Sequence, residues 1–164
     1  MKRPLAIVSL VILTALLGAS PASAAKPLRE FLPNSDAVIE GACDFPVAVT
    51  VLENNEFSTT FFKDGNVTRV LVTGRLVVEL TNVDTGESLV ANISGPGIFT
   101  FTTDTTLLKT EGQWLLVFFP GDLGEGEPGQ IWLTSGQFVV EFSEEGQRLL
   151  EAHGTFKNVC LLLG

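Results

Sequence analysis

Apolar and polar residues alternate with a period of two over most of the chain beyond residue 43. The pattern is clearest in segments 45–52, 75–81 and 137–143, where valine, leucine or phenylalanine recurs at every second position. Because successive side chains of a β-strand point to opposite faces, the alternation predicts strands with one buried and one more polar face. No window from 43 to 164 keeps a helical apolar stripe for three turns, so helices are not predicted there.

Turn sequences separate these segments at short intervals, each with glycine, asparagine or aspartate where a positive φ is needed. The spacing predicts an all-β fold of about eight to ten strands, an antiparallel β-barrel or a closed β-sandwich. Gly74 predicts a bulge or bend of the kind that a closing barrel requires. The segment 114–119 is apolar on both faces, which predicts a central strand. The clearest hairpins are 75–81 with 88–94 and 137–143 with 147–154.

The first residues have the order of a secretory signal peptide. Lys2 and Arg3 precede an apolar run at 5–17, and Ala22-Ser23-Ala24 supplies a cleavage pattern. The run is shorter than the ~20 residues that a spanning helix needs. We therefore predict a signal peptide at 1–24, an N-terminal arm at 25–42, a single β domain at 43–164, and a secreted, extracellular protein with no membrane span.

Charge narrows the choice of partners. Without residues 1–24 the chain keeps 8 basic and 19 acidic residues, a net charge of −11. Such a chain is repelled by phosphate backbones and by anionic head groups, so nucleic acid is not a predicted partner. The high apolar content also argues against disorder.

Cys43 and Cys160 are the only cysteines, and both lie in the exported part. In an oxidising compartment an even pair is most simply a disulfide, here closing a loop of 117 residues from position 43 to position 160. A metal pair would need further ligands, and His153 is the only histidine. We therefore predict a disulfide between Cys43 and Cys160.

No catalytic or cofactor motif is present: the sequence has no G-x-S-x-G, H-E-x-x-H, C-x-x-C or glycine-rich phosphate loop. His153 would need a nucleophile such as Ser94 or Ser135 beside it, and its surroundings indicate a half-exposed strand residue. The loop 121–129 carries three acidic residues that Ca²⁺ favours, but without calcium-loop spacing. We predict no catalytic residue, no metal site and no cofactor.

The aromatic residues suggest the one candidate site. Twelve phenylalanines and two tryptophans occur without any tyrosine, which is typical of a dry core. The alternative is an apolar cavity, because barrels of about eight strands can hold one small ligand. The candidate lining residues are Phe45, Phe57, Phe61, Phe99, Phe101, Trp114, Phe118, Phe138 and Phe142.

The stretches Cys43-Asp44-Phe45-Pro46-Val47, Leu80-Thr81-Asn82, Thr85-Gly86-Glu87-Ser88 and Asn92-Ile93-Ser94-Gly95-Pro96 resemble those of small secreted bacterial β-domains of uncharacterised function. The expected shape is also similar to the barrel of allene oxide cyclases and dirigent proteins. That second resemblance concerns the fold alone and implies no functional residue.

Three functions are compatible with these observations. The leading hypothesis is a secreted, non-catalytic binding or interaction domain, whose partner is a small apolar ligand or an extracellular protein. The second is a templating barrel enzyme, cyclase- or isomerase-like, in which an apolar interior folds a reactive ligand. The third is a structural protein associated with the cell envelope. Buried charge inside a cavity, for example from Arg75 or Glu79, would favour the enzyme.

Overall fold

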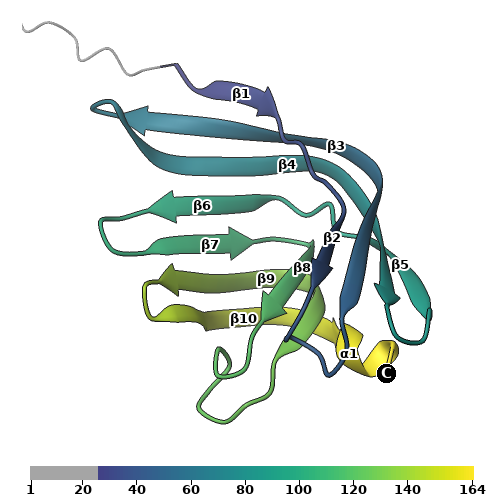
Figure 1. The fold of residues 1–164 in the computed structure, drawn as a ribbon. Coiled ribbons are helices and arrows are strands. Elements are labelled where there is room, and N and C mark those ends of the chain that lie inside the picture. Colours follow the sequence, from purple (N-terminus) through teal and green to yellow (C-terminus); the bar gives the residue numbers. More distant parts are fainter. Residues whose placement is uncertain (1–25) are drawn as a thin grey trace, which may run out of the picture.

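The computed structural model describes residues 26–164, which form one antiparallel sheet and a terminal helical turn (Figure 1). The predicted signal peptide lies outside the described residues. The elements are β1 (Leu28–Phe31), β2 (Ala37–Ile39), β3 (Val47–Lys63), β4 (Asn66–Asn82), β5 (Ser88–Asn92), β6 (Gly97–Phe101), β7 (Thr106–Thr110), β8 (Gln113–Phe118), β9 (Gln130–Ser143), β10 (Gly146–Asn158) and α1 (Val159–Leu162).

The sheet has ten strands in the order β1-β3-β4-β6-β7-β9-β10, with three side branches: β2 pairs with β3, β5 with β4, and β8 with β9. All described pairings are antiparallel, and both predicted hairpins are present. The all-β class is therefore confirmed. The predicted closure is not confirmed. Among the described strands, β1 and β10 lie at the two ends of the order and do not pair with each other, so the sheet is open. The arm predicted at 25–42 contributes β1 and β2, which both lie along β3.

The two longest hairpins bend sharply at glycines. Gly74 lies mid-way along β4 with φ +137°, and a Cβ there would stand 2.1 Å from the Asn55 carbonyl oxygen. Gly136 of β9, with φ +126°, faces Gly154 of β10 at the second bend. The predicted bend at Gly74 is thus confirmed. Because of the two bends, β2 and β8 lie in front of the remaining strands in Figure 1.

Two hydrophobic clusters fill the folded sheet. The first lies around Val78, Leu80 and Ile131, and the second around Phe118 and Phe138, all at most 1% exposed. β8 and the first half of β9 contribute to both: Leu116 belongs to the second cluster, whereas Leu115 packs against the first. The apolar residues on the two faces of β8 therefore pack against different clusters. However, among the described strands β8 pairs only with β9, so it is an edge strand and not a central one.

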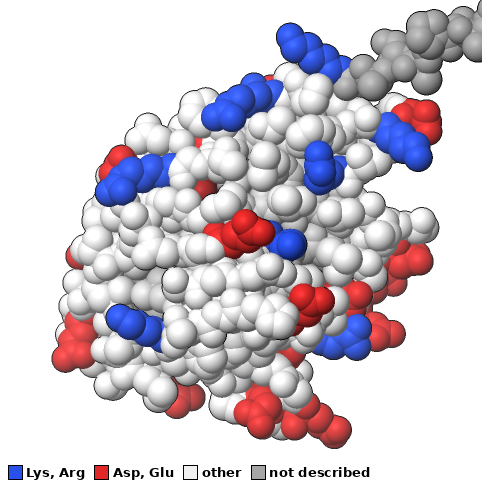
Figure 2. All heavy atoms as spheres, turned by 180° about the vertical axis from the view of Figure 1, so that it is seen from behind, with Lys and Arg blue, Asp and Glu red and all other residues white. Residues whose placement is uncertain are grey.

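We call the face of the sheet that points away from the clusters the outer face. Figure 2 shows it, with the molecule turned by 180° from the view of Figure 1. It is built by the alternate residues that do not enter the core. In β3, Ser58 pairs with buried Val72 on the inner face, so Phe57 and Phe61 point outward. This face is largely uncharged, and its acidic side chains gather mainly toward the end opposite β1 (Figure 2).

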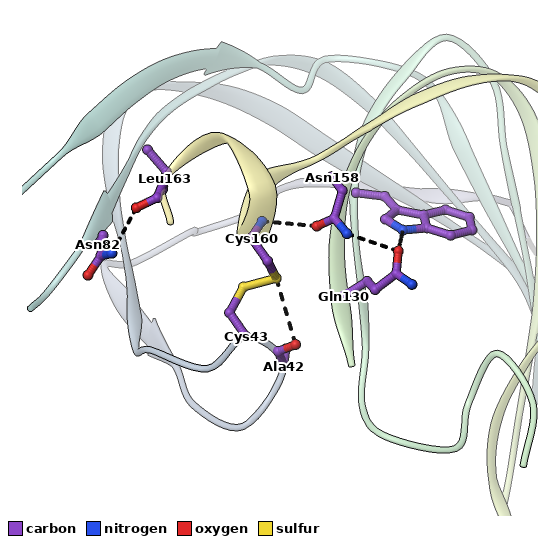
Figure 3. The surroundings of a disulfide bond; sticks show 8 residues. Ala42, Cys43, Asn82, Gln130, Asn158, Cys160 and Leu163 are labelled. Carbon is purple, nitrogen blue, oxygen red and sulfur yellow. Dashed lines mark hydrogen bonds between the residues drawn. A yellow bond between two sulfur atoms is a disulfide. The ribbon is translucent and has the colours of Figure 1, made fainter. Parts of the chain in front are cut away.

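The C-terminus is fastened by a covalent bond and by polar contacts (Figure 3). Cys160 of α1 forms the predicted disulfide with Cys43, with 5.3 Å between the two Cα atoms. Asn158 caps α1, since its side chain accepts from the Cys160 N–H at 3.0 Å. Its amide nitrogen donates to Gln130 Oε1 at 3.0 Å, an oxygen that also accepts from the Trp132 indole at 2.7 Å. The helical turn is therefore fixed to β9 and to the segment before β3.

Phe138 lies at the centre of the second cluster and is 0% exposed. We expect Phe138→Ala to lower the free energy of unfolding by about 3–5 kcal/mol, through lost apolar burial and the cavity left behind. Phe101→Ala is the matched control, because Phe101 is 38% exposed and should cost about 1 kcal/mol or less. Urea denaturation of both variants measures the difference, and equal midpoints would contradict the assigned inner face.

The disulfide closes a long loop, with 117 residues between its cysteines in sequence. The loop-closure model gives ~4–5 kcal/mol for a loop of this length. We expect the double variant Cys43→Ser/Cys160→Ser to lose stability of this order, while wild-type protein unfolded without reductant shows no free thiol. Denaturant unfolding and thiol titration are the measurements. Two reactive thiols per wild-type chain would refute the pairing.

Candidate functional site: the groove along strand β5

The nine aromatic residues considered as ligand lining do not surround one common space. Phe118 and Phe138 are packed within the second cluster, with Phe99, Trp114 and Phe142 at its margin. Phe45 packs against the first cluster. The other three lie further out: Phe57 and Phe61 are on the outer face of the sheet, and Phe101 is partly exposed near the end of the β6–β7 hairpin.

The structure also places the two polar features considered in the sequence, His153 and the acidic loop 121–129. The His153 side chain is 70% exposed, and its Nε2 lies 3.7 Å from a Glu151 carboxylate oxygen that is itself solvent-accessible. Asp122 accepts hydrogen bonds from the Phe119 N–H at 2.6 Å and from Gln147 Nε2 at 2.7 Å, so it ties its loop to β10. Within residues 26–164, no group of three or more His, Cys, Asp or Glu side chains is arranged to hold a metal ion.

A feature that the sequence analysis did not identify is the free edge of β5. Asn82 N–H donates to the Glu87 carbonyl and Ile93 N–H to the Leu76 carbonyl, both at 2.9 Å, so odd-numbered residues of this segment bond to β4. In an antiparallel ladder the alternate residues then point away from the partner strand. The N–H and C=O groups of Ser88, Val90 and Asn92 are therefore directed to the free edge, where no described strand pairs with them.

A groove runs along this edge. It consists of two adjoining hollows of about 360 and 530 Å³, which share Val90, Leu133 and Lys157. We call it the β5 groove. One wall is residues 87–92, and the other side is formed by Gln113, Leu133, Thr134, Ser135, Thr155, Phe156, Lys157, Leu162 and Leu163.

Asn82 positions the two sides of this groove relative to each other. It is 2% exposed, and its Oδ1 accepts from the backbone N–H groups of Asp84 and Thr85, at 2.9 and 3.3 Å, which shapes the turn into β5. Its Nδ2 donates to the Leu163 carbonyl at 2.8 Å, which holds the end of α1 (Figure 3). One buried amide therefore fixes the strand on one side of the groove relative to the helical turn on the other.

The β5 groove is lined by both apolar and polar side chains, and it contains one charge of each sign, from Lys157 and Glu87. Val90 and Phe156 are 62% and 47% exposed, far more than core residues of the same types. Lys157 lines both hollows, and no carboxylate of the described residues lies within salt-bridge distance of its ammonium. The arrangement offers backbone hydrogen-bond partners along one wall, a mixture of apolar and polar side chains on the other side, and a lysine ammonium without a carboxylate partner among the described residues.

The structure also buries a carboxylate, at the bend of β3. Glu56 is 5% exposed and lies opposite Gly74. Its Oε2 accepts from Asn34 Nδ2 at 3.0 Å, and its carbonyl accepts from the Leu32 N–H at 2.9 Å, so the N-terminal arm is attached here. Burial raises the pKa of Glu56 above its ordinary value, although the Asn34 hydrogen bond acts in the opposite direction.

The raised pKa predicts how stability depends on pH. A carboxyl group whose pKa is higher in the folded state favours folding most when it is protonated, and this contribution is lost as pH rises through the folded pKa. We expect Glu56→Gln, which keeps the acceptor oxygen, to be more stable than wild type at neutral pH. The difference should vanish near pH 4. Denaturant unfolding across pH measures it, with exposed Glu40→Gln as the control for lost charge. A Glu56→Gln protein less stable at pH 7 would contradict the assignment.

Comparison of the chain with protein-family models, with curated proteins and with solved structures finds no significant match. In the part of the chain that the structure describes, no helix combines the length and apolar character needed to cross a bilayer. The site is therefore interpreted from its own geometry.

Proposed function

We propose that this protein is a secreted, non-catalytic binding domain that holds an extended polypeptide segment in the β5 groove. The observation that carries the proposal is the row of backbone groups at Ser88, Val90 and Asn92, directed to the free edge of β5 that borders the groove. An extended peptide satisfies such a row by adding one strand to the sheet. The disulfide between Cys43 and Cys160 is compatible with an extracellular location.

The bound segment would contact both sides of the groove. Its backbone exchanges hydrogen bonds with the three even-numbered residues of β5, and alternate side chains point toward Leu133 or toward solvent beside Val90. A carboxylate of the segment pairs with Lys157. The added strand would occupy the space between β5 and β10. We therefore propose that the closed sandwich or barrel expected from the sequence forms when the segment is bound.

Two observations favour a polypeptide over a small apolar ligand. The nine aromatic side chains are distributed over the core, its margin and the outer face, and so do not form a common pocket. The β5 groove is long and open, and one wall is backbone. Unpaired backbone groups are best matched by another strand, which supports the interaction branch of the leading hypothesis.

A synthetic peptide tests this proposal. The probe is an eight-residue peptide of alternating valine and threonine with a free carboxyl terminus, and its control is the same peptide N-methylated at alternate residues. We expect the first peptide alone to shift the amide resonances of Ser88, Val90 and Asn92 and to slow their hydrogen exchange. The N-methylated peptide should bind at least about tenfold more weakly, since each backbone hydrogen bond contributes ~1 kcal/mol.

Two variants complete the test. Val90→Pro removes an N–H that faces the free edge, so the protein should fold and yet bind the peptide at least about tenfold more weakly. Val90→Thr keeps the N–H and should bind like wild type. If N-methylation leaves the affinity unchanged, or the shifts fall outside β5 and its opposite wall, the proposal is wrong.

A further inference from the structure

Charge is unevenly distributed along the sheet. We define the basic end as residues 26–31 and 57–69, which comprise β1 and the tip of the β3–β4 hairpin. It holds four basic residues, Lys26, Arg29, Lys63 and Arg69, against two acidic ones, Glu30 and Asp64. The remaining described residues hold four basic and 17 acidic side chains. Figure 2 shows this separation, with blue side chains gathered near the start of the grey trace and most red ones toward the opposite end.

Two arginines at the basic end are held on aromatic rings. The Arg29 guanidinium lies 4.6 Å from the centroid of Phe57, and that of Arg69 lies 4.2 Å from the centroid of Phe61. No described carboxylate is within salt-bridge distance of either arginine. A guanidinium that stacks on a ring keeps its N–H groups free for an anion. Arg75 and Arg148 differ, because they pair with Glu53 at 2.7 Å and Glu141 at 2.8 Å.

The spacing of the two stacked pairs excludes a single small anion as the common ligand. Phe57 and Phe61 are four residues apart on β3, which corresponds to ~13 Å along a strand. One phosphate or carboxylate cannot reach both guanidinium groups. The geometry fits a surface that presents many anions side by side.

Apolar side chains at the same end indicate which anionic surface fits. Phe31 and Val67 are 52% and 42% exposed, and Leu28, which is 47% exposed, lies at the same end on the opposite face of β1 from Arg29. Exposed apolar groups next to Lys and Arg suit the interface of a membrane, where the apolar groups enter the head-group region and the charges meet anionic lipids. We propose that the basic end docks on the surface of an anionic lipid bilayer.

The negative net charge of the whole chain does not prevent this contact. The Debye length is ~8 Å at physiological ionic strength, so charges beyond that distance are largely screened from the membrane. With β1 and the β3–β4 tip against the bilayer, most acidic side chains lie toward the far end of the molecule (Figure 2). The local excess of basic residues therefore determines the sign of the interaction.

Vesicle co-sedimentation tests the proposal, with protein recovered from the culture medium. The vesicles are phosphatidylcholine with one quarter phosphatidylglycerol, or phosphatidylcholine alone, in about 0.1 M salt. We expect wild type to bind the anionic vesicles, with partitioning onto neutral vesicles at least about tenfold lower. Arg29→Gln/Arg69→Gln should reduce binding to anionic vesicles by a similar factor.

Arg75→Gln/Arg148→Gln is the matched control, because it removes the same net charge from arginines that already have carboxylate partners. It should bind within about twofold of wild type, and circular dichroism confirms that all variants fold. If the two double variants lose binding to anionic vesicles equally, the binding depends only on the net charge of the protein, and the proposal is wrong. Wild-type binding to a sulfated dextran but not to anionic vesicles would overturn it as well.

Discussion

The architecture depends on backbone passing against backbone where no Cβ can be accommodated. At the second bend a Cβ on Gly136 would stand 2.5 Å from the His153 carbonyl oxygen, and one on Gly154 would stand 2.3 Å from the Ser135 carbonyl oxygen. These contacts let β9 and β10 change direction together while their ladder continues across the bend. Without them β8 and the first half of β9 could not lie between two clusters. The free edge of β5 follows from the same geometry, because β6 pairs with only one half of β4 and β5 pairs with the other half.

Hydrogen bonds of buried polar side chains fix the positions of the β4–β5 turn and of α1, which apolar packing alone does not determine. Asn82 is buried, and an amide in that position is costly unless each of its polar atoms is hydrogen-bonded. Both polar atoms of the Asn82 amide are hydrogen-bonded: Oδ1 accepts from the β4–β5 turn, and Nδ2 donates to the Leu163 carbonyl. Asn158 and Gln130 do the same for the start of α1. The positions of the two sides of the β5 groove thus depend on side chains that a hydrophobic pattern does not reveal.

Much of the fold could be predicted from local signals. Alternation and turn residues locate the strands, Gly74 marks a bend, and the cysteine pair follows from compartment and count. The candidate site could not be found this way, because alternation assigns faces within one strand but not between strands. Phe57 and Phe99 illustrate the limit: both occupy apolar positions of alternating segments, yet strand register places them on opposite faces. Bulges such as the one after Val51 also reset the faces, and an edge position like that of β5 depends on which distant strands pair.

The disulfide also has a mechanical consequence. A pulling force applied between Lys26 and Gly164 would pass from the N-terminal arm through Cys43 and Cys160 to the last residues of the chain. The strands from β3 to β10 lie between the two cysteines in sequence, so the covalent link bypasses them and they carry no tension. Such a load would peel β1 and β2 from β3 and unwind α1 beyond Cys160, and the extension would then stop. If the protein is held at its two ends, only the short segments outside the disulfide-closed loop would extend, and tension would not unfold the rest of the domain.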